Sequence, residues 1–451
     1  MNVASRLGAW RSAGGSLAQS LAAAVQHAVL DGQIPVGSPL PSERALARDM
    51  DVSRGTIVAA LALLRDAGWI RTRHGSGSVV RLPPRLTTRT APWSLDHGGG
   101  EVELDLTQAV TAAPHRAYLA AARRAVDRCA TLLLDAGTAN AGLPQLRELL
   151  AERYTRQGLA THPGQILITS GATAALTLLA DHLCDRRRPI LVESPTYPGA
   201  LTVLRRRGTR LISIPVSEGS WGQAPELIGS SRASLAYLTP DFHNPTGALM
   251  PDDVRRQVSA CADRHDVTVV VDETMRDLDL RTPPVDIPHL AGPRVITIGS
   301  TSKVIWSGLR VGWIRASAAL VRELLLHPLQ ARLSPPPLEQ LIAHDLLGDL
   351  DGLVSERRAQ LRHQRDHLVG LLGDHGGWTY TVPSGGLTVW LQLHNTTAVA
   401  VAARARRRGL ALTPGPQFSA DRTLTNYLRV PFTASPEILT RAVDLLVSPP
   451  I

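Results

Sequence analysis

The sequence predicts a small α+β domain at the N-terminus, a linker and a larger α/β domain. The chain has 451 residues, which is more than a single hydrophobic core usually supports. Up to about residue 82, apolar residues recur at helical spacing and end in a hairpin pattern. After residue 100, short apolar runs alternate with helical stretches, which is typical of a largely parallel sheet with crossover helices.

The first domain, residues 1–82, contains three predicted helices followed by a two-stranded hairpin. Its helices carry apolar residues at a spacing of three or four, and Ser42 is a suitable N-cap for the second of them. The third helix starts at Ser53 and Gly68 ends it. Such a helix-turn-helix with a wing places its second motif helix in the major groove of DNA.

Several polar residues of this domain are expected to face DNA, at the start of the third helix, at the start of the second helix and on the wing. The alternative is a small helical docking domain with a solvated charged face. Residues 1–82 carry nine arginines and five acidic residues, which favours a polyanionic partner. The predicted DNA-binding residues are Arg44, Ser53, Arg54, Thr56, Arg71, Arg73 and His74.

The linker is predicted at residues 83–100, which are rich in proline and glycine. Residues 101–451 form the second domain. Its large subdomain is expected at about 151–315, and its small α/β subdomain at about 101–150 together with 316–451. Buried strands are predicted at 166–168, 190–192, 211–214, 235–238, 267–271 and 295–298.

Composition restricts the class of protein further. The net charge of +9 and the pI near 10.2 permit nucleic acid as a partner, although an accumulation of arginine alone would give the same values. The sequence shows neither a signal-peptide pattern nor an apolar run long enough to span a membrane, so a cytoplasmic protein is expected. The three cysteines, without metal-ligand spacing, predict reduced thiols and no metal site.

Of the 48 lysines and arginines in the chain, Lys303 is the single lysine. Arginine can replace lysine in most surface roles, so a lysine that persists needs chemistry that arginine lacks. A primary amine can lose its proton and condense with an aldehyde, whereas a guanidinium effectively never deprotonates. Lys303 is therefore a candidate to form the Schiff base with pyridoxal 5'-phosphate (PLP). The alternative is that this lysine survives by chance on the surface, and the motif around it argues against chance.

The other parts of a PLP site follow the predicted strands. Asp272 closes one strand and can bind the pyridine nitrogen, Asn244 can bind the phenolic oxygen, and Tyr197 can stack on the ring. Arg310 and a small-residue turn before an apolar helix can hold the phosphate. The predicted cofactor-binding residues are Ser170, Gly171, Ala172, Tyr197, Asn244, Asp272, Ser300, Ser302, Lys303 and Arg310.

These motifs resemble two known families. The segments 40–47, 52–57 and 75–80 are similar to the winged helix of the GntR superfamily, over some 65 residues. Residues 101 to 445, with Gly142–Arg147 and the cofactor motifs, resemble fold-type I PLP-dependent aminotransferases, whose large domain has a parallel or mixed sheet. By that resemblance Arg429, in the segment 426–430, holds the α-carboxylate of an effector, with Asn244 as a further effector contact.

A winged helix followed by an aminotransferase-like domain resembles the MocR-type regulators. The resemblance implies a DNA-binding transcription regulator in which PLP senses an amine, an amino acid or PLP itself. It also implies a head-to-tail, domain-swapped homodimer on double-stranded operator DNA.

Two departures from the aminotransferase pattern bear on activity. Aminotransferases usually have a tyrosine two or three residues after the ring-nitrogen aspartate, where this chain has Thr274 and Met275. An arginine that binds a second carboxylate in some relatives is replaced by Gly199. A catalytically weak or inactive domain is therefore expected, and a dicarboxylate or GABA-like effector is disfavoured. The alternatives are an aminotransferase with an accessory DNA-binding domain and a PLP-free scaffold that dimerises the winged helix.

Overall fold

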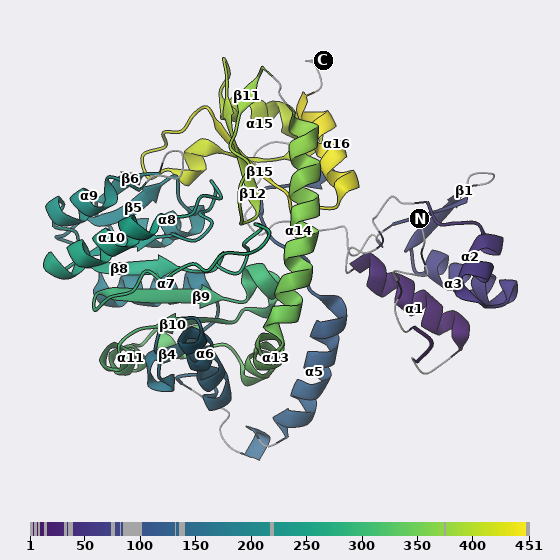
Figure 1. Ribbon diagram of the computed structural model, residues 1–451, viewed down its shortest axis with the longest axis horizontal. Helices are drawn as coiled ribbons and strands as arrows, with labels where there is room; N and C mark the ends of the chain where they lie inside the picture. The colour runs from purple at the N-terminus through teal and green to yellow at the C-terminus, as the bar shows by residue number, and fades with distance from the viewer. Residues whose placement is uncertain are drawn as a thin grey trace.

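The computed structural model shows two domains (Figure 1), and α1 (Leu17–Leu30) of the first contacts α5 (His115–Cys129) of the second. The predicted linker lies outside the described residues, except for Pro83. The structure describes residues 3, 7, 10–12, 16–30, 34, 39–73, 77–81, 83, 102–130, 132–134, 140–216, 221–373 and 376–447.

The N-terminal domain consists of α1 (Leu17–Leu30), α2 (Glu43–Met50), α3 (Arg54–Asp66) and the hairpin β1 (Ile70–Arg73) and β2 (Gly77–Val80). The predicted cap at Ser42 is confirmed, because its side chain accepts a hydrogen bond from the backbone of the first turn of α2. Ser53 caps α3 in the same way. The hydrophobic faces of the three helices meet in one core.

A short N-terminal segment completes this core, which the sequence pattern did not predict. Val3 and Leu7 are buried against the helices. Arg11, in the turn η2 (Trp10–Ser12), donates to the carbonyls of Met50 and Asp51 at 2.8 and 2.7 Å. These bonds satisfy carbonyls at the end of α2, which an isolated helix leaves without partners.

The large domain is built on a seven-stranded sheet with the order β4-β10-β9-β8-β7-β5-β6. All six predicted strands are confirmed, although β10, which runs antiparallel to both of its neighbours, was not predicted. The strands are β4 (Ile166–Thr169), β5 (Ile190–Ser194), β6 (Leu211–Pro215), β7 (Leu235–Leu238), β8 (Thr268–Asp272), β9 (Val295–Ser300) and β10 (Gly312–Arg315).

Helices cover this sheet and connect its strands, as Figure 1 shows. Around the sheet lie α5 (His115–Cys129), α6 (Pro144–Arg156), α7 (Ala172–Leu183), α8 (Pro198–Arg205), α9 (Ala224–Ser230), α10 (Asp252–Arg264), α11 (Ala318–Leu325), α12 (Gln330–Leu333) and α13 (Pro337–Gly348). The predicted subdomain boundary at residue 151 falls inside α6, which packs against β4.

A second, four-stranded sheet has the order β11-β12-β15-β14, and α14 (Leu350–Leu372) leads from the large domain to it. Its strands are β11 (Trp378–Thr379), β12 (Thr388–Leu393), β14 (Thr413–Pro414) and β15 (Tyr427–Pro431), with α15 (Ala398–Arg407) and α16 (Pro436–Val447) beside them. A parallel pair, β3 (Leu104–Asp105) and β13 (Leu410–Ala411), joins the start of the second domain to this region.

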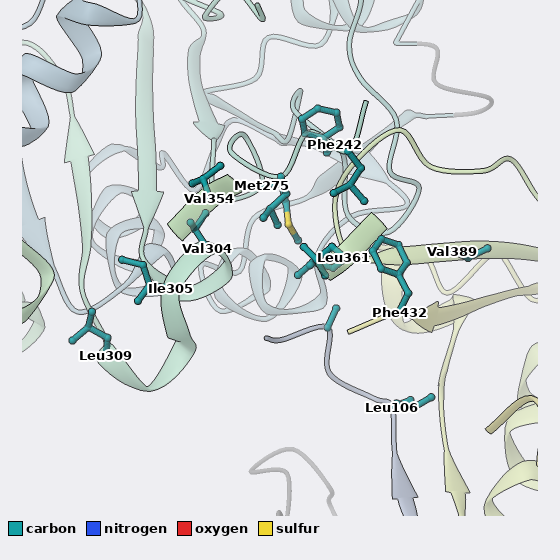
Figure 2. Packing of buried hydrophobic residues seen from close by; sticks show 14 of the residues in the cluster. Leu106, Phe242, Met275, Val304, Ile305, Leu309, Val354, Leu361, Val389 and Phe432 are labelled. Carbon is teal, nitrogen blue, oxygen red and sulfur yellow. The ribbon is translucent and has the colours of Figure 1, made fainter. Parts of the chain in front are cut away.

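Apolar packing ties the second domain together around its polar site. Phe242, Met275, Val304 and Leu361 belong to one buried cluster that reaches from the large sheet to the small one (Figure 2). Removing such side chains from a close-packed core is costly, so the cluster fixes the loops that follow the strands. No helix in the described part of the chain is long and apolar enough to cross a membrane.

Candidate cofactor site and DNA interface

The predicted cofactor residues converge at one edge of the large sheet. β4, β8 and β9 run in the same direction, so the residues that follow them lie at a common edge. Asp272 ends β8, Lys303 follows β9, and Gly171 follows β4. Ligands of α/β sheets bind at this carboxyl edge of the strands.

Asp272 is buried, with a hydrogen-bond donor on each of its carboxylate oxygens. The hydroxyl of Tyr237 donates to Oδ2 at 2.6 Å, and the backbone N–H of Thr274 donates to Oδ1 at 2.9 Å. Burial raises the pKa of Asp272, whereas these hydrogen bonds and the nearby charge of Lys303 act in the opposite direction. The carboxylate is therefore fixed in position, as binding a pyridine nitrogen requires.

Lys303 lies in a π-helical turn, η5 (Ser302–Trp306), directly after Thr301. Its Nζ donates to the carbonyl of Ala109 at 2.9 Å, and the hydroxyl of Thr111 donates to the Lys303 carbonyl at 3.1 Å. Burial and, after it, the positive charge of Arg429 lower the pKa of Lys303 to about 8. A larger fraction of this amine is thus neutral near pH 7 than of an ordinary lysine, which favours condensation with an aldehyde.

A cradle suited to phosphate forms around Gly171, the N-cap of α7. Gly171 has φ +105°, and a Cβ atom built on it would lie 3.9 Å from Nη1 of Arg310 and 4.0 Å from Oγ of Ser300. The N-terminus of α7 thus faces a guanidinium and a hydroxyl, the donor set that binds phosphate. The backbone N–H of Ser170 already donates to the Leu333 carbonyl at 2.6 Å, so the free backbone donors of this turn come from the residues after Ser170.

Asn244 and Tyr197 complete the predicted ring contacts. Asn244 is buried, and its Oδ1 has no hydrogen-bond partner among the described residues. Tyr197 lies directly before α8, and a Cβ on Gly199 would lie only 2.4 Å from the Tyr197 ring. Glycine at 199 therefore lets the tyrosine ring take this position, which a larger side chain would displace.

Arg429 lies on β15 of the small sheet, opposite Trp390 of β12. Its guanidinium is 4.8 Å from the centre of the Phe418 ring and donates to the carbonyl of Thr107. Burial lowers the pKa of Arg429 to about 10, and among the described residues its Nε has no hydrogen-bond partner. A buried cation with an unused donor is suited to a carboxylate.

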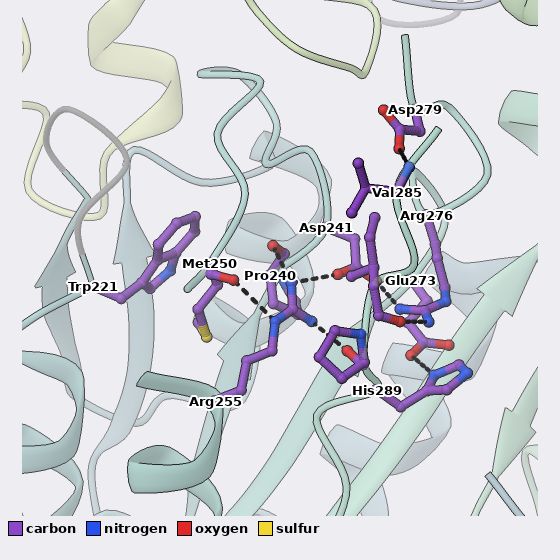
Figure 3. A network of polar contacts seen from close by, with 12 residues as sticks. Trp221, Pro240, Asp241, Met250, Arg255, Glu273, Arg276, Asp279, Val285 and His289 are labelled. Carbon is purple, nitrogen blue, oxygen red and sulfur yellow. Dashed lines mark hydrogen bonds and ion pairs between the residues drawn. The ribbon is translucent and has the colours of Figure 1, made fainter. Parts of the chain in front are cut away.

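Two buried networks support the loops of the site. Asp241, three residues before Asn244, is paired with Arg255 at 2.7 Å and with Arg276 at 2.9 Å (Figure 3). Glu273, next to Asp272, contacts the ring of His289 at 2.6 Å. The loops that carry Asn244 and Asp272 are therefore joined to each other by the buried ion pair between Asp241 and Arg276.

Sequence reasoning missed several residues of this site. Tyr237 was counted within an apolar strand, where a tyrosine is expected to be core. The contacts of Thr107 and Ala109 are made by backbone carbonyls, which carry no side-chain signal. Phe418 precedes the segment 426–430 by eight residues and belongs to no motif. Met275 packs in the apolar cluster of Figure 2. Its thioether side chain has no hydroxyl to offer a cofactor.

The candidate DNA-binding residues lie on three elements: the start of α3, the first turn of α2, which carries Arg44, and β1, which carries Arg71. Arg54 is exposed and pairs with Glu43 of α2 at 3.0 Å, while the hydroxyls of Ser53 and Thr56 are 2.9 Å apart. Arg44 and Arg71 are exposed. His74 and the side chain of Arg73 lie outside the described residues. The DNA-contact roles of all seven residues remain predictions.

The comparisons with known proteins agree with both halves of this description. Aminotransferase class I and II matches residues 112–446, and the chain belongs to this family. The gntR family of bacterial regulatory proteins matches residues 17–80. The protein is therefore a fusion of a GntR DNA-binding domain with an aminotransferase-like domain.

Individual relatives include both regulators and enzymes. The chain is 28% identical over 404 residues to the HTH-type transcriptional regulator YisV of Bacillus subtilis, covering 82% of this chain and 83% of YisV. It is 32% identical over 302 residues to 2-aminoadipate transaminase of Thermus thermophilus, covering 64% and 75%. The crystal structure of LysN, an alpha-aminoadipate aminotransferase from Thermus thermophilus complexed with N-(5'-phosphopyridoxyl)-L-leucine, is similar with a TM-score of 0.70 and 28% identity, covering 76% and 90%.

The residues of this chain fit PLP as the cofactor of the fold. Lys303 would supply the amine, Asp272 an oriented carboxylate, and the cradle at Gly171 the space and donors for a phosphate. The unpaired Oδ1 of Asn244 places a buried polar group beside them. When bound, PLP supplies an electron sink for the chemistry of amino compounds.

Proposed function

We propose that this protein is a transcription regulator in which the aminotransferase-like domain senses an amino compound, or PLP itself, and thereby controls operator binding. Two features of the one chain support the proposal. The winged helix presents exposed arginines at its recognition helix. In the second domain Arg429 donates to the carbonyl of Thr107, and Lys303 donates to the carbonyl of Ala109 in the same short segment. That pairing of an amine with a buried cation suited to a carboxylate is the observation that carries the sensing role.

We infer that the effector is an amino acid with a single carboxylate and an uncharged side chain. Arg429 can hold the α-carboxylate while the amino group reaches Lys303. The surroundings of Arg429 are aromatic. The rings of Phe418 and Trp390 meet edge to face, and the ring of Trp390 is stacked on that of Tyr427. Gly199 provides no cation for a second carboxylate, so an acidic side chain would be desolvated without a partner.

The structure supports a route from the site to the DNA-binding domain. The segment 102–112 is the first described stretch after the predicted linker, and it is held by three side chains of the second domain. Arg429 bonds to Thr107, Lys303 to Ala109, and Arg357 to Ala112 at 2.6 Å. An effector that binds Lys303 and Arg429 competes with the backbone carbonyls of this segment for these two side chains. It therefore binds more tightly when the segment is released than when the segment is held, and such a difference in affinity is what shifts a conformational equilibrium. We expect the protein to form a homodimer with head-to-tail subunits, in which this change at the effector site alters how the two winged helices bind the operator.

An aminotransferase with an accessory DNA-binding domain is the second candidate, favoured by the similarity to 2-aminoadipate transaminase. We propose that any transamination is weak, because Met275 offers no hydroxyl at the position where aminotransferases have a tyrosine. A full catalytic cycle with an amino acid and a 2-oxo acid, at a rate typical of enzymes, would favour this candidate.

One experiment distinguishes these functions. Purified protein loaded with PLP is titrated with a panel of amino compounds while its visible absorbance is recorded. Operator binding is then measured with and without each compound that changes the spectrum. The regulator predicts that a responding compound changes operator affinity; compounds that change the spectrum and leave operator binding unaltered would exclude effector control and point to the enzyme.

A further inference from the structure

Tyr237 lies on β7, the neighbour of the strand that ends in Asp272. In the parallel register of the two strands Tyr237 is paired with Val270, two residues before Asp272. Its side chain reaches along the sheet, so that the hydroxyl lies 2.6 Å from Oδ2 of Asp272. The other three residues of β7 are apolar and buried, so packing alone would be served by a phenylalanine here.

Both partners of this contact are removed from water. Tyr237 is 1% exposed and Asp272 is 6% exposed. A carboxylate oxygen accepts only, so the tyrosine hydroxyl is the donor, and Thr274 donates to the other oxygen. One donor on each oxygen restricts rotation of the carboxylate, which leaves the remaining lone pairs with a defined direction.

We propose that Tyr237 is a positioning residue for the cofactor, whose hydroxyl keeps Asp272 ionised and oriented toward the pyridine nitrogen of PLP. This inference rests on the cofactor part of the proposed function and is independent of operator binding. It assigns a role to a residue that lies outside every motif that identifies the site.

The surroundings of Tyr237 favour donation to Asp272. Burial, and next the charge of Asp272, raise the pKa of Tyr237 well above its usual value, so the hydroxyl keeps its proton. The nearby buried carboxylate of Glu193 already accepts from Nε1 of Trp221 at 2.6 Å and from the N–H of Thr239 at 2.9 Å. The competing acceptor is therefore occupied, and the hydroxyl of Tyr237 donates its hydrogen bond to Asp272.

The absence of a tyrosine at position 275 increases the importance of this contact. With Met275 in the apolar core, fewer polar groups are available to orient the cofactor ring. Asp272 then carries a larger share of ring orientation, and a donor that holds Asp272 has a larger effect than it would beside a full set of contacts.

The test compares Tyr237→Phe with Tyr154→Phe in the full-length protein. Tyr154 is a matched control, because it is also buried, and its hydroxyl oxygen accepts a hydrogen bond from Nε1 of Trp313 at 2.9 Å instead of donating to Asp272. Three quantities are measured for each variant: the thermal unfolding midpoint of the PLP-free protein, the dissociation constant for PLP, and the pH dependence of the visible absorbance of the PLP-loaded protein.

We expect Tyr237→Phe to weaken PLP binding about tenfold and to shift the absorbance titration upward by about one pH unit, the size of one hydrogen bond to a charged group. Without the hydroxyl, Asp272 becomes more basic and draws the proton from the pyridine nitrogen. A neutral ring withdraws fewer electrons, so the nitrogen that joins PLP to Lys303 keeps its proton to a higher pH. In an Asp272→Asn background, the same substitution should change PLP affinity little.

A purely structural role would lower the unfolding midpoint of Tyr237→Phe and leave the absorbance titration where the wild type has it, which overturns the proposal. Equal shifts in Tyr154→Phe would overturn it as well. If the wild-type protein shows no visible band with PLP, the cofactor assignment itself fails. If the wild type binds PLP and the Tyr237→Phe variant has the same PLP affinity and absorbance titration, only the role of Tyr237 is rejected.

Discussion

The amine of Lys303 donates a hydrogen bond to the backbone carbonyl of Ala109, 194 positions earlier in the chain, with Nζ and the oxygen 2.9 Å apart. Thr111 of the same segment donates to the Lys303 carbonyl. The lysine that the composition singles out is thereby tied to the first part of the second domain. This contact fixes where the amine lies, and its environment determines when it is reactive.

The low pKa of Lys303 predicts the pH dependence of PLP attachment. The neutral amine is the nucleophile, and its fraction grows as pH rises through the pKa of about 8. The rate of appearance of the visible band, measured by mixing PLP with the PLP-free protein, should therefore rise with a midpoint near pH 8. Arg429→Gln removes a positive charge that lowers this pKa, so its midpoint should move to higher pH. A midpoint near the ordinary lysine value of 10.5 in the wild type would contradict the environment described here.

Lys303 is the expected site of covalent attachment. Lys303→Ala should fold with a wild-type thermal midpoint and show no visible band, and borohydride reduction of the wild type should leave the label on Lys303. Lys303→Arg is the control, because it keeps the charge and cannot condense with an aldehyde. Label retained after borohydride treatment of either variant would refute the assignment, since the chain has no second lysine.

Arg54 and Arg44 are expected to differ in their effects on operator binding. If Arg54 leaves Glu43 to contact a guanine, Arg54→Ala should cost about 1–3 kcal/mol and relax specificity at one base pair. Arg44→Ala should weaken all sequences alike and flatten the salt dependence. Titrations with operator and scrambled DNA at several salt concentrations measure both effects, with Arg48→Ala as an exposed control from the same domain. Unchanged affinity in both variants would reject this docking.

Arg429 should be required for the effector response. Arg429→Ala is expected to retain PLP but to lose an effector coupling of about 1–3 kcal/mol, or roughly 5–150-fold in affinity relative to its own operator binding without effector. Operator titrations with and without effector measure this, and Arg422→Ala, an exposed arginine of the same domain, should respond as the wild type does. A normal response in Arg429→Ala would mean that the effector has no carboxylate or binds elsewhere, and would favour PLP itself as the signal.

The ion pairs of Asp241 should matter for stability. Asp241→Asn leaves Arg255 and Arg276 without their shared counter-charge in a buried place, so the free energy of unfolding should fall by about 3–5 kcal/mol. Asp266→Asn is the matched control, because its pair with Arg294 is exposed and should contribute at most about 1 kcal/mol. Urea denaturation of the PLP-free variants gives both values; similar losses in the two would show that burial does not govern the pair at Asp241.

The sequence by itself determined the order of the domains, six of the seven strands of the large sheet and most of the candidate side chains of the site. Ser42 and Ser53 cap their helices because capping depends on the next few residues alone. Asp272 and Lys303 follow apolar runs, and the ends of parallel strands must meet at one edge of a sheet. These are local patterns, and neighbours along the chain are sufficient to specify them.

Only the tertiary structure decided which distant groups meet. Tyr237 reaches Asp272 because two strands pair in a particular register, and Arg429 contacts the carbonyl of Thr107 because the small sheet packs against the start of the domain. The pairing of Arg54 with Glu43 likewise depends on how α2 crosses α3. Contacts of this kind depend on packing between elements and on burial, which no single stretch of sequence encodes.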